Sequence, residues 1–319
     1  MASVRRLLKR WRDNYYLSLM LAYSLKPLWF ISSKAALQVE QKVRKNGVTI
    51  RLPNGNSMSI ARDSGIGMAS LLFWHGLDGY EPETSRTLRI LFERATTFID
   101  VGANCGLYSV LGALWNPKLA VTAFEPVPPI FSRLKNNVLL NRLEDRVRCE
   151  NVALSNTSGK ATLFLPKGES LDFETTGTLV KESWQATKAD PQLLEVETVR
   201  FDQYEARHPM RVDLIKIDVE DFEADVLEGM REVIARDRPF IVCEILPRAH
   251  RNLRTCKLVE ALNYQPYWIT PVGYIKVPKF DCSRAGYTDF LLSPVSTSEV
   301  VLTSLDALWD LKNKSGGTG

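Results

Sequence analysis

Two acidic residues stand at the ends of apolar segments, and their positions are those that bind small polar ligands. Asp100 lies within Phe98-Ile-Asp-Val, just before a glycine-containing turn, and Glu125 follows the apolar run 120–124. In open α/β sheets, a glycine-rich turn after one strand and a carboxylate after the next together bind a nucleoside. We therefore predict one nucleoside-type ligand, with Asp100 near its charged end and Glu125 on its ribose.

The turn after Asp100 indicates which nucleoside. It reads Gly-Ala-Asn-Cys-Gly, so the pattern is D-x-G-x-N-x-G and not the G-x-G-x-x-G of dinucleotide sites. Its glycines are expected to bring backbone N–H groups close to the ligand. An acid beside the turn suits a cationic amino-acid ligand better than a diphosphate, so we predict S-adenosylmethionine. The predicted cofactor-binding residues are Asp100, Gly102, Asn104, Gly106, Glu125 and Asn151.

A second set of charged residues follows a later apolar segment, 212–218. Lys216, Asp218 and Glu220 alternate along it, and an extended chain would point all three to one side. We predict that they are catalytic, with Asp218 or Glu220 removing a proton from an alcohol. In the alternative arrangement, Asp218 and Glu244, at the ends of adjacent strands, hold one Mg²⁺ through oxygen ligands.

The spacing of apolar residues predicts alternating strands and helices. Strands are expected at 97–101, 119–124, 146–152, 212–218 and 239–245, with helices at 107–115, from 128, after 220 and at 250–262. A hairpin with an Asn-Gly turn (48–60) and a helix (83–94) precede them. This order is typical of an α/β fold with a mostly parallel, doubly wound sheet. Apolar pieces at 267–269 and 290–292 are expected to form a terminal antiparallel pair.

The charge of the chain bears on whether it binds nucleic acid, and its cysteines bear on the compartment in which it works. Five of the 41 Lys and Arg residues precede Asp13, so the rest of the chain, which carries 37 acidic residues, is close to neutral. No global basic field for nucleic acid is indicated. The five cysteines show no C-x-x-C spacing, which favours a reducing cytoplasm.

Residues 5–25 form a basic and aromatic helical pattern, expected to pack on the domain or in a homodimer, or alternatively to lie on the inner face of a membrane.

Several ordered sequence blocks resemble the FkbM-type S-adenosylmethionine-dependent methyltransferases. The blocks are Phe98-Ile-Asp-Val-Gly-Ala-Asn-Cys-Gly-Leu-Tyr-Ser, Ala123-Phe-Glu-Pro-Val-Pro, Asn137-Val-Leu-Leu-Asn, Val152-Ala-Leu-Ser with Gly159, Asp213-Leu-Ile-Lys-Ile-Asp-Val-Glu, Glu228-Gly and Arg238-Pro-Phe-Ile-Val-Cys-Glu. The resemblance implies a Rossmann-like class I methyltransferase fold and O-methylation of a small-molecule, glycan or lipid-linked acceptor. One departure stands out: Asp221 occupies a position where the family usually has glycine, and Asp tolerates a left-handed turn better than most residues.

With this resemblance the chain divides into four parts. We expect an N-terminal basic and aromatic helical segment (1–33), an accessory hairpin and helix (34–95), a methyltransferase domain (96–295) and a C-terminal tail (296–319). A polar stretch within the domain, 166–196, is expected to be an insertion or a lid. Two other functions stay open: a non-catalytic binding or membrane-tethered module that keeps the cofactor fold, and, less favoured, a nicotinamide-dependent oxidoreductase.

Overall fold

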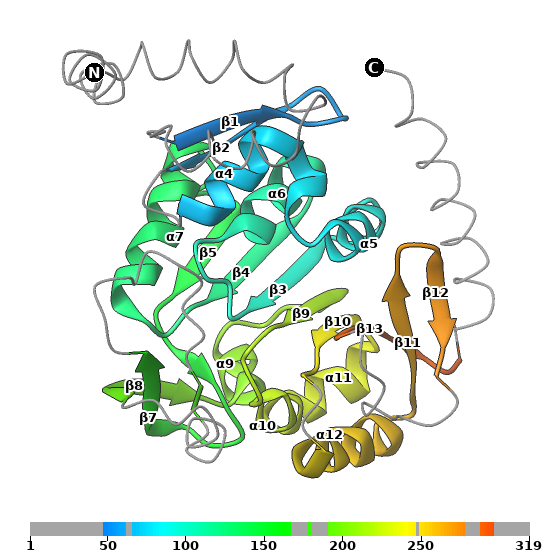
Figure 1. Ribbon diagram of the computed structural model, residues 1–319. Coiled ribbons are helices and arrows are strands. Elements are labelled where there is room, and N and C mark those ends of the chain that lie inside the picture. Colours follow the sequence, from blue (N-terminus) through cyan, green and yellow to red (C-terminus); the bar gives the residue numbers. More distant parts are fainter. Residues whose placement is uncertain are drawn as a thin grey trace, which may run out of the picture.

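An eight-stranded sheet forms the centre of the protein (Figure 1). The computed structural model describes residues 47–61, 66–166, 178–179, 191–246, 249–277 and 288–296. The sheet order is β12-β11-β13-β10-β9-β3-β4-β5. Its strands are β3 (Thr97–Val101), β4 (Ala120–Phe124), β5 (Val147–Glu150), β9 (Leu214–Ile217), β10 (Phe240–Glu244), β11 (Tyr264–Thr270), β12 (Gly273–Lys276) and β13 (Asp289–Pro294).

The pairing of these strands confirms the predicted mixed sheet. The strands β5, β4, β3, β9 and β10 are parallel neighbours, whereas β13 runs antiparallel to both β10 and β11. The expected terminal antiparallel pair is therefore present, as β11 and β13. The chain makes β11 first and then returns to insert β13 between β10 and β11, an order that the spacing of apolar residues does not reveal.

Helices cover both faces of the sheet, as Figure 1 shows. Phe98 and Leu214 belong to one apolar core, with α4 to α7, and their chain neighbours Ile99 and Ile215 belong to the other, with α9 to α12. This division follows from the alternation of side chains along each strand. The helices are α4 (Ile66–His75), the 3₁₀ turn η3 (Gly76–Gly79), α5 (Pro82–Phe92), α6 (Leu107–Trp115), α7 (Pro128–Leu140), α9 (Phe201–Arg207), α10 (Glu223–Gly229), α11 (Arg231–Asp237) and α12 (Ala249–Ala261).

The predicted N-terminal hairpin is present and docks on α7. It consists of β1 (Gly47–Arg51) and β2 (Ser57–Ala61), paired antiparallel. Two asparagines of α7 hold it: Asn137 Oδ1 accepts the Ala61 N–H at 2.8 Å, and Asn141 Oδ1 accepts the Ser59 N–H at 2.9 Å. Asn137 also donates to the Cys105 carbonyl at 2.8 Å. The hairpin is thereby tied to the turn that follows β3.

A small second sheet, β6-β8-β7, contains the two ends of the predicted insertion. It consists of β6 (Ala153–Leu154), β7 (Gly159–Pro166) and β8 (Pro191–Val199). The last part of the 166–196 stretch is thus a strand, and Thr178 pairs with Phe164 across an isolated bridge. Residues 167–177 and 180–190, and with them the expectation of a lid, lie outside the described residues.

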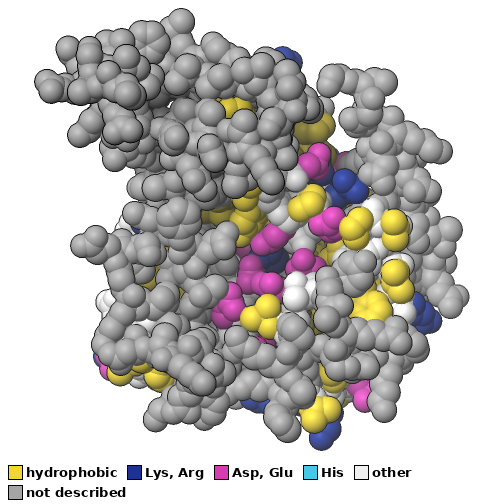
Figure 2. Space-filling view, viewed as in Figure 1, with side chains coloured by type: hydrophobic (Ala, Val, Ile, Leu, Met, Phe, Trp, Pro, Cys, Tyr) yellow, Lys and Arg dark blue, Asp and Glu magenta, His cyan; other side chains and the backbone are white. Residues whose placement is uncertain are grey.

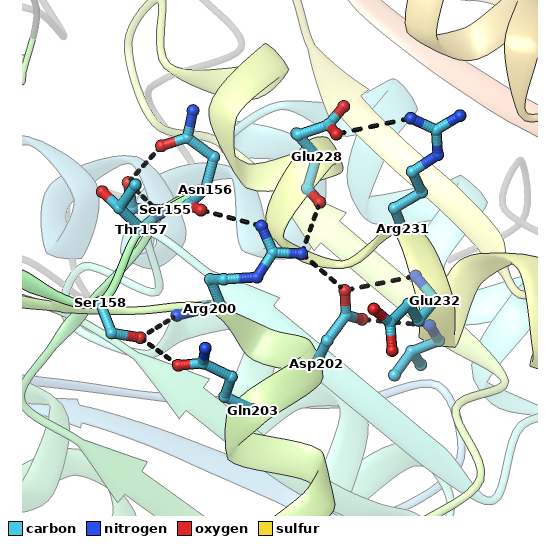
Figure 3. A network of polar contacts seen from close by, with 11 residues as sticks. Ser155, Asn156, Thr157, Ser158, Arg200, Asp202, Gln203, Glu228, Arg231 and Glu232 are labelled. Atoms are coloured by element: carbon cyan, nitrogen blue, oxygen red, sulfur yellow. Dashed lines mark hydrogen bonds and ion pairs between the residues drawn. The ribbon is translucent and has the colours of Figure 1, made fainter.

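Arg200 joins this small sheet to the helices that follow β9 (Figure 3). Its guanidinium donates to the Asn156 carbonyl at 2.9 Å and to Asp202 Oδ2 at 3.2 Å. Asp202 in turn accepts the backbone N–H of Val233 in the first turn of α11, at 3.1 Å. A Cβ on Gly229 would lie 2.1 Å from the Ser155 carbonyl oxygen, so glycine permits this close approach. Two of the sequence blocks, 152–155 and 228–229, therefore meet in a structural contact.

Several predictions concern residues outside the described ranges. The N-terminal segment 1–33 is among them, as are residues 34–46 and nearly all of the C-terminal tail, 297–319. Among the described residues, no helix has the length and apolar character needed to cross a bilayer.

Candidate active site

Asp100 is a buried acid within β3. It is 1% exposed, and Oδ2 accepts the Ser109 hydroxyl at 2.6 Å. Its other oxygen, Oδ1, is buried and has no hydrogen-bond partner among the described residues. Burial raises the pKa of Asp100, although the Lys216 ammonium and the Ser109 hydroxyl oppose this shift. Asp100 therefore presents a buried acceptor atom that a bound ligand can satisfy.

The backbone N–H groups of the turn between β3 and α6 are hydrogen-bonded within the protein. Each N–H from residue 102 to residue 106 has an intramolecular acceptor: Phe124 O for Gly102 and Ala103, Glu125 Oε2 for Asn104, Asn104 Oδ1 for Cys105, and Ala103 O for Gly106. The expectation that the glycines bring N–H groups to the ligand is not met here, because the end of β4 and the turn itself take them. A diphosphate needs free donors at such a turn, and this turn has none to give.

The glycines instead allow close packing around the site. Gly102 has φ +74°, and a Cβ there would lie 1.9 Å from the Asp218 carbonyl oxygen. Gly106 has φ +83°, and its Cβ would lie 2.3 Å from Leu134 Cδ1. Only glycine combines this backbone conformation with this contact distance. Gly102 thus lets the end of β9 lie directly against the turn, which positions Asp218.

Glu125 closes β4 and anchors the same turn. It is 5% exposed; Oε2 accepts the Asn104 N–H at 3.0 Å and Oε1 accepts the Val127 N–H at 2.9 Å. Burial raises the pKa of Glu125 to about 7, even though these two N–H groups favour the charged form. Each carboxylate oxygen can accept a second hydrogen bond, so ribose hydroxyls remain compatible with this position. Asn151 donates to the Glu125 carbonyl at 2.8 Å and thereby supports the bend after β4.

Lys216 and Asp218 form an ion pair at the carboxyl end of β9. Lys216 Nζ lies 2.7 Å from Asp218 Oδ2; the lysine side chain is 6% exposed and that of Asp218 is 26% exposed, so only Asp218 is open to a substrate. Burial alone would lower the pKa of Lys216, but the carboxylates of Asp218, Glu81 and Asp100 reverse this and raise it. Burial would likewise raise the pKa of Asp218, but the Lys216 charge outweighs it and the pKa is lowered. Both groups are therefore ionised at neutral pH.

Glu220 follows a change in backbone direction. Glu220 has φ +50° and Asp221 has φ +74°, so the extended chain ends before them. The alternation that predicted three side chains on one side therefore holds for Lys216 and Asp218 only. The Glu220 carbonyl accepts the Thr178 hydroxyl at 2.6 Å. Asp221 does adopt the left-handed conformation expected where the family usually has glycine.

Two further carboxyl groups lie beside Asp218. Glu244, at the end of β10, forms a side-chain hydrogen bond with Asp218, and burial together with the Asp218 charge raises the pKa of Glu244. Glu244 thus holds a proton at neutral pH and donates it toward Asp218. Asp289 of β13 stands opposite Glu244 in the antiparallel register, and burial raises its pKa to about 7.

This arrangement gives the magnesium alternative no support. Among the described residues, no group of three or more His, Cys, Asp or Glu side chains is placed to hold a metal ion. Asp218, one of the two predicted ligands, is already neutralised by Lys216.

Two residues of the site were missed in the sequence. The Tyr108 hydroxyl donates to Glu81 Oε2 at 2.7 Å, and Lys216 Nζ lies 5.1 Å from the centre of the Tyr108 ring. Glu81 precedes α5 and Tyr108 is in the first turn of α6. Neither spacing nor strand ends mark Glu81, since it lies in a turn outside the alternating pattern. Figure 2 shows Asp and Glu side chains gathered near the centre of one face, with Lys or Arg among them.

The fold and site together define a Rossmann-like α/β protein whose acidic residues gather at the carboxyl ends of its parallel strands. The family model of the methyltransferase FkbM domain matches residues 100–266, just over half of the chain. The protein therefore belongs to the FkbM methyltransferase family.

Individual relatives are 29% to 30% identical over part of this chain. Methyltransferase sdnD of Sordaria araneosa is 30% identical over 155 residues, which cover 42% of this chain and 60% of sdnD. The 31-O-demethyl-FK506 methyltransferase FkbM of Streptomyces tacrolimicus is 29% identical over 208 residues, 58% of this chain and 76% of that protein. The 2-O-methyltransferase NoeI of Sinorhizobium fredii is 29% identical over 155 residues, which cover 46% of this chain and 61% of NoeI. A crystal structure of an FkbM methyltransferase from Methylobacillus flagellatus aligns with a TM-score of 0.41 and 14% identity, over 73% of this chain and 56% of that one.

Proposed function

We propose that this protein transfers a methyl group from S-adenosylmethionine to a hydroxyl of a small-molecule, glycan or glycolipid acceptor. One observation carries the choice of cofactor: the turn after β3 has no N–H left for a phosphate, while buried acids stand at the ends of β3 and β4. This environment favours a cationic nucleoside. Family membership supports methyl transfer, and the names of two relatives, a 2-O-methyltransferase and a 31-O-demethyl-FK506 methyltransferase, support oxygen as the acceptor.

The proposed binding roles follow from the geometry of the turn. Asp100 Oδ1 is the acceptor for a cationic part of the ligand, because it is buried and unused. Glu125 accepts the ribose hydroxyls, with Asn104, Gly102 and Gly106 shaping the turn beside it. Asn151 acts through Glu125, whose backbone it holds. When bound, S-adenosylmethionine supplies an electrophilic methyl group on a sulfonium.

Asp218 is the group we assign to the acceptor hydroxyl. It is the most exposed member of the buried ion pair, and Lys216 keeps it ionised and oriented. Methyl transfer is an in-line displacement, so alignment of the hydroxyl is the main requirement. The Asp218 carboxylate would take the hydroxyl proton as the new C–O bond replaces the methyl–sulfur bond, with S-adenosylhomocysteine as the leaving group. Glu220 remains a proposed member of the catalytic set, on the turn that follows β9.

The experiment is a methyl-transfer assay with a radiolabelled donor and an extract containing hydroxylated metabolites, glycans and glycolipids, followed by mass identification of the labelled product. Asp218→Asn keeps the size of the side chain and removes its ability to take a proton. We expect it to lower kcat by about a hundredfold or more, the usual contribution of a general base. Transfer at an unchanged rate would remove Asp218 from the mechanism, and a product labelled on nitrogen or carbon would overturn O-methylation.

The two alternatives are separated by binding and turnover. Tight NADH binding without affinity for S-adenosylhomocysteine would support an oxidoreductase. The absence of free N–H donors in the turn argues against this outcome, because the diphosphate of NADH needs such donors. Affinity for the nucleoside with no transfer to any fraction would support a non-catalytic module. We also propose a cytoplasmic location, with the inner face of the membrane as the alternative. In the described part of the chain, Cys105, Cys149 and Cys243 are free thiols, which supports a reducing compartment.

A further inference from the structure

Glu81 comes from a part of the chain that precedes the family match. The match starts at residue 100, whereas Glu81 lies in the turn between η3 and α5. It has φ +41°, a left-handed conformation that a non-glycine residue adopts only at a cost. The tertiary structure nevertheless places its carboxylate within the site.

The Glu81 carboxylate is held beside the ion pair of β9. Its Oε2 accepts the Tyr108 hydroxyl at 2.7 Å, and Tyr108 is 5% exposed. Tyr108 immediately precedes Ser109, the residue that donates to Asp100. Lys216 Nζ faces the Tyr108 ring at 5.1 Å and interacts electrostatically with both Glu81 and Asp100. Glu81 and Asp100 therefore act on the same ammonium, although they belong to two separate segments.

Carboxyl groups outnumber ammonium groups around Lys216. Glu81, Asp100, Asp218 and Asp289 interact electrostatically with a single ammonium, that of Lys216, which is already hydrogen-bonded to Asp218. Separately, Asp100 Oδ1 is buried and has no hydrogen-bond partner among the described residues. A buried acceptor without a donor, next to excess carboxylate, is a site for a cation that carries N–H groups.

We propose that Glu81, together with Asp100, binds the ammonium group of the amino-acid portion of the nucleoside cofactor. This inference rests on the proposed function, since it assumes an S-adenosyl ligand. It adds a specificity residue from the accessory segment to a site whose other members lie within the family match. The described part of the accessory segment that carries Glu81 is then part of the binding site and not only a structural support.

The test is calorimetric and uses the full-length protein with two ligands. One is S-adenosylhomocysteine, and the other is its deaminated analogue, which keeps the nucleoside and the carboxylate but has hydrogen in place of the ammonium. Glu81→Gln removes the charge while the amide oxygen can still accept the Tyr108 hydroxyl. Glu83→Gln is the matched control, because it makes the same change two residues further along the chain, in the first turn of α5.

We expect wild-type protein to bind S-adenosylhomocysteine about tenfold or more tightly than the analogue, the scale of one hydrogen bond to a charged group. Glu81→Gln should lose about tenfold for S-adenosylhomocysteine and nothing for the analogue, while Glu83→Gln should match wild type with both. Equal loss for both ligands, or no loss, would overturn the assignment.

Two further results have separate meanings. If Glu81→Gln fails to fold, as judged by circular dichroism, the wild-type comparison decides: equal affinity for the two ligands shows that no carboxylate recognises the ammonium, and the inference falls. If wild-type protein binds neither ligand, the proposed function itself has failed, and this is seen before any variant is measured.

Discussion

Replacement of Gly102 by alanine tests how the turn positions the catalytic strand. The new Cβ would lie 1.9 Å from the Asp218 carbonyl oxygen, whereas real Cβ contacts are essentially never shorter than 3.0 Å. The turn and the end of β9 must therefore separate by roughly 1 Å. The hydrogen bond from Asp218 N–H to the Val101 carbonyl, now 3.0 Å, lies in the path of that movement.

The expected cost has two parts. An alanine in the left-handed conformation of Gly102, at φ +74°, costs about 1–2 kcal/mol. The backbone displacement adds about 1–3 kcal/mol, the usual range for overpacking a close contact. We therefore expect the free energy of unfolding to fall by about 2–5 kcal/mol. Because Asp218 moves with its carbonyl, kcat should also fall by about a hundredfold, the scale associated with a 1 Å misplacement.

Gly55 provides the matched control for backbone strain. It has φ +89°, in the turn between β1 and β2, but a Cβ there would meet no atom within 4 Å. Gly55→Ala should therefore show the conformational cost alone and leave kcat unchanged. Urea unfolding gives the stability of both variants, and the methyl-transfer assay, run well below each midpoint, gives kcat. If Gly102→Ala is no less stable than Gly55→Ala and equally active, the close approach of β9 to the turn is not what positions Asp218.

Three further outcomes follow from the contacts described. Burial, and then the charge of Asp221, raise the pKa of Glu223 from 4.5 to about 8; since the folded state holds this proton more tightly, wild-type stability should fall by up to about 5 kcal/mol as pH rises from 4.5 to 8. Glu223→Gln, whose amide oxygen can still accept the Asp221 N–H, should be less sensitive to pH in urea unfolding, and an unchanged pH slope would contradict the assignment. Asn137→Ala removes the acceptor of the Ala61 N–H and the donor to the Cys105 carbonyl, so it should destabilise by about 2–5 kcal/mol, whereas exposed Asn136→Ala should cost little. Excess chelator should leave turnover intact, and a loss restored by added Mg²⁺ would reinstate the metal alternative.

Much of the fold was predictable because apolar periodicity is local. Strands 97–101 and 120–124, helix 107–115 and the hairpin around Asn54-Gly55 appear where the pattern places them. The exit from β9 was less well predicted, since extended geometry was assumed through Glu220. Left-handed conformations at Glu220 and Asp221 end that geometry, and only at Asp221, where the family usually has glycine, did the sequence mark such a conformation.

The site was predictable to the extent that its residues stand at strand ends. Asp100, Glu125, Lys216 and Asp218 share the end of the sheet expected for them, because parallel strands bring their carboxyl ends to one edge. The role of Gly102 was not predictable in the same way. Its close contact is with the Asp218 carbonyl, which is more than a hundred residues away in the chain.

The amino-acid sequence by itself determined the order of strands and helices, the left-handed conformation at Asp221, and the strand-end acids. These depend on the conformational preferences of each residue and on spacings of two to four positions. Only the tertiary structure decided that Glu81 reaches Tyr108, that Glu244 shares its proton with Asp218, and that Gly102 and Ala103 donate their N–H groups to the end of β4. Such contacts depend on the packing of distant segments, and both burial and charge then act on groups that no local pattern places together.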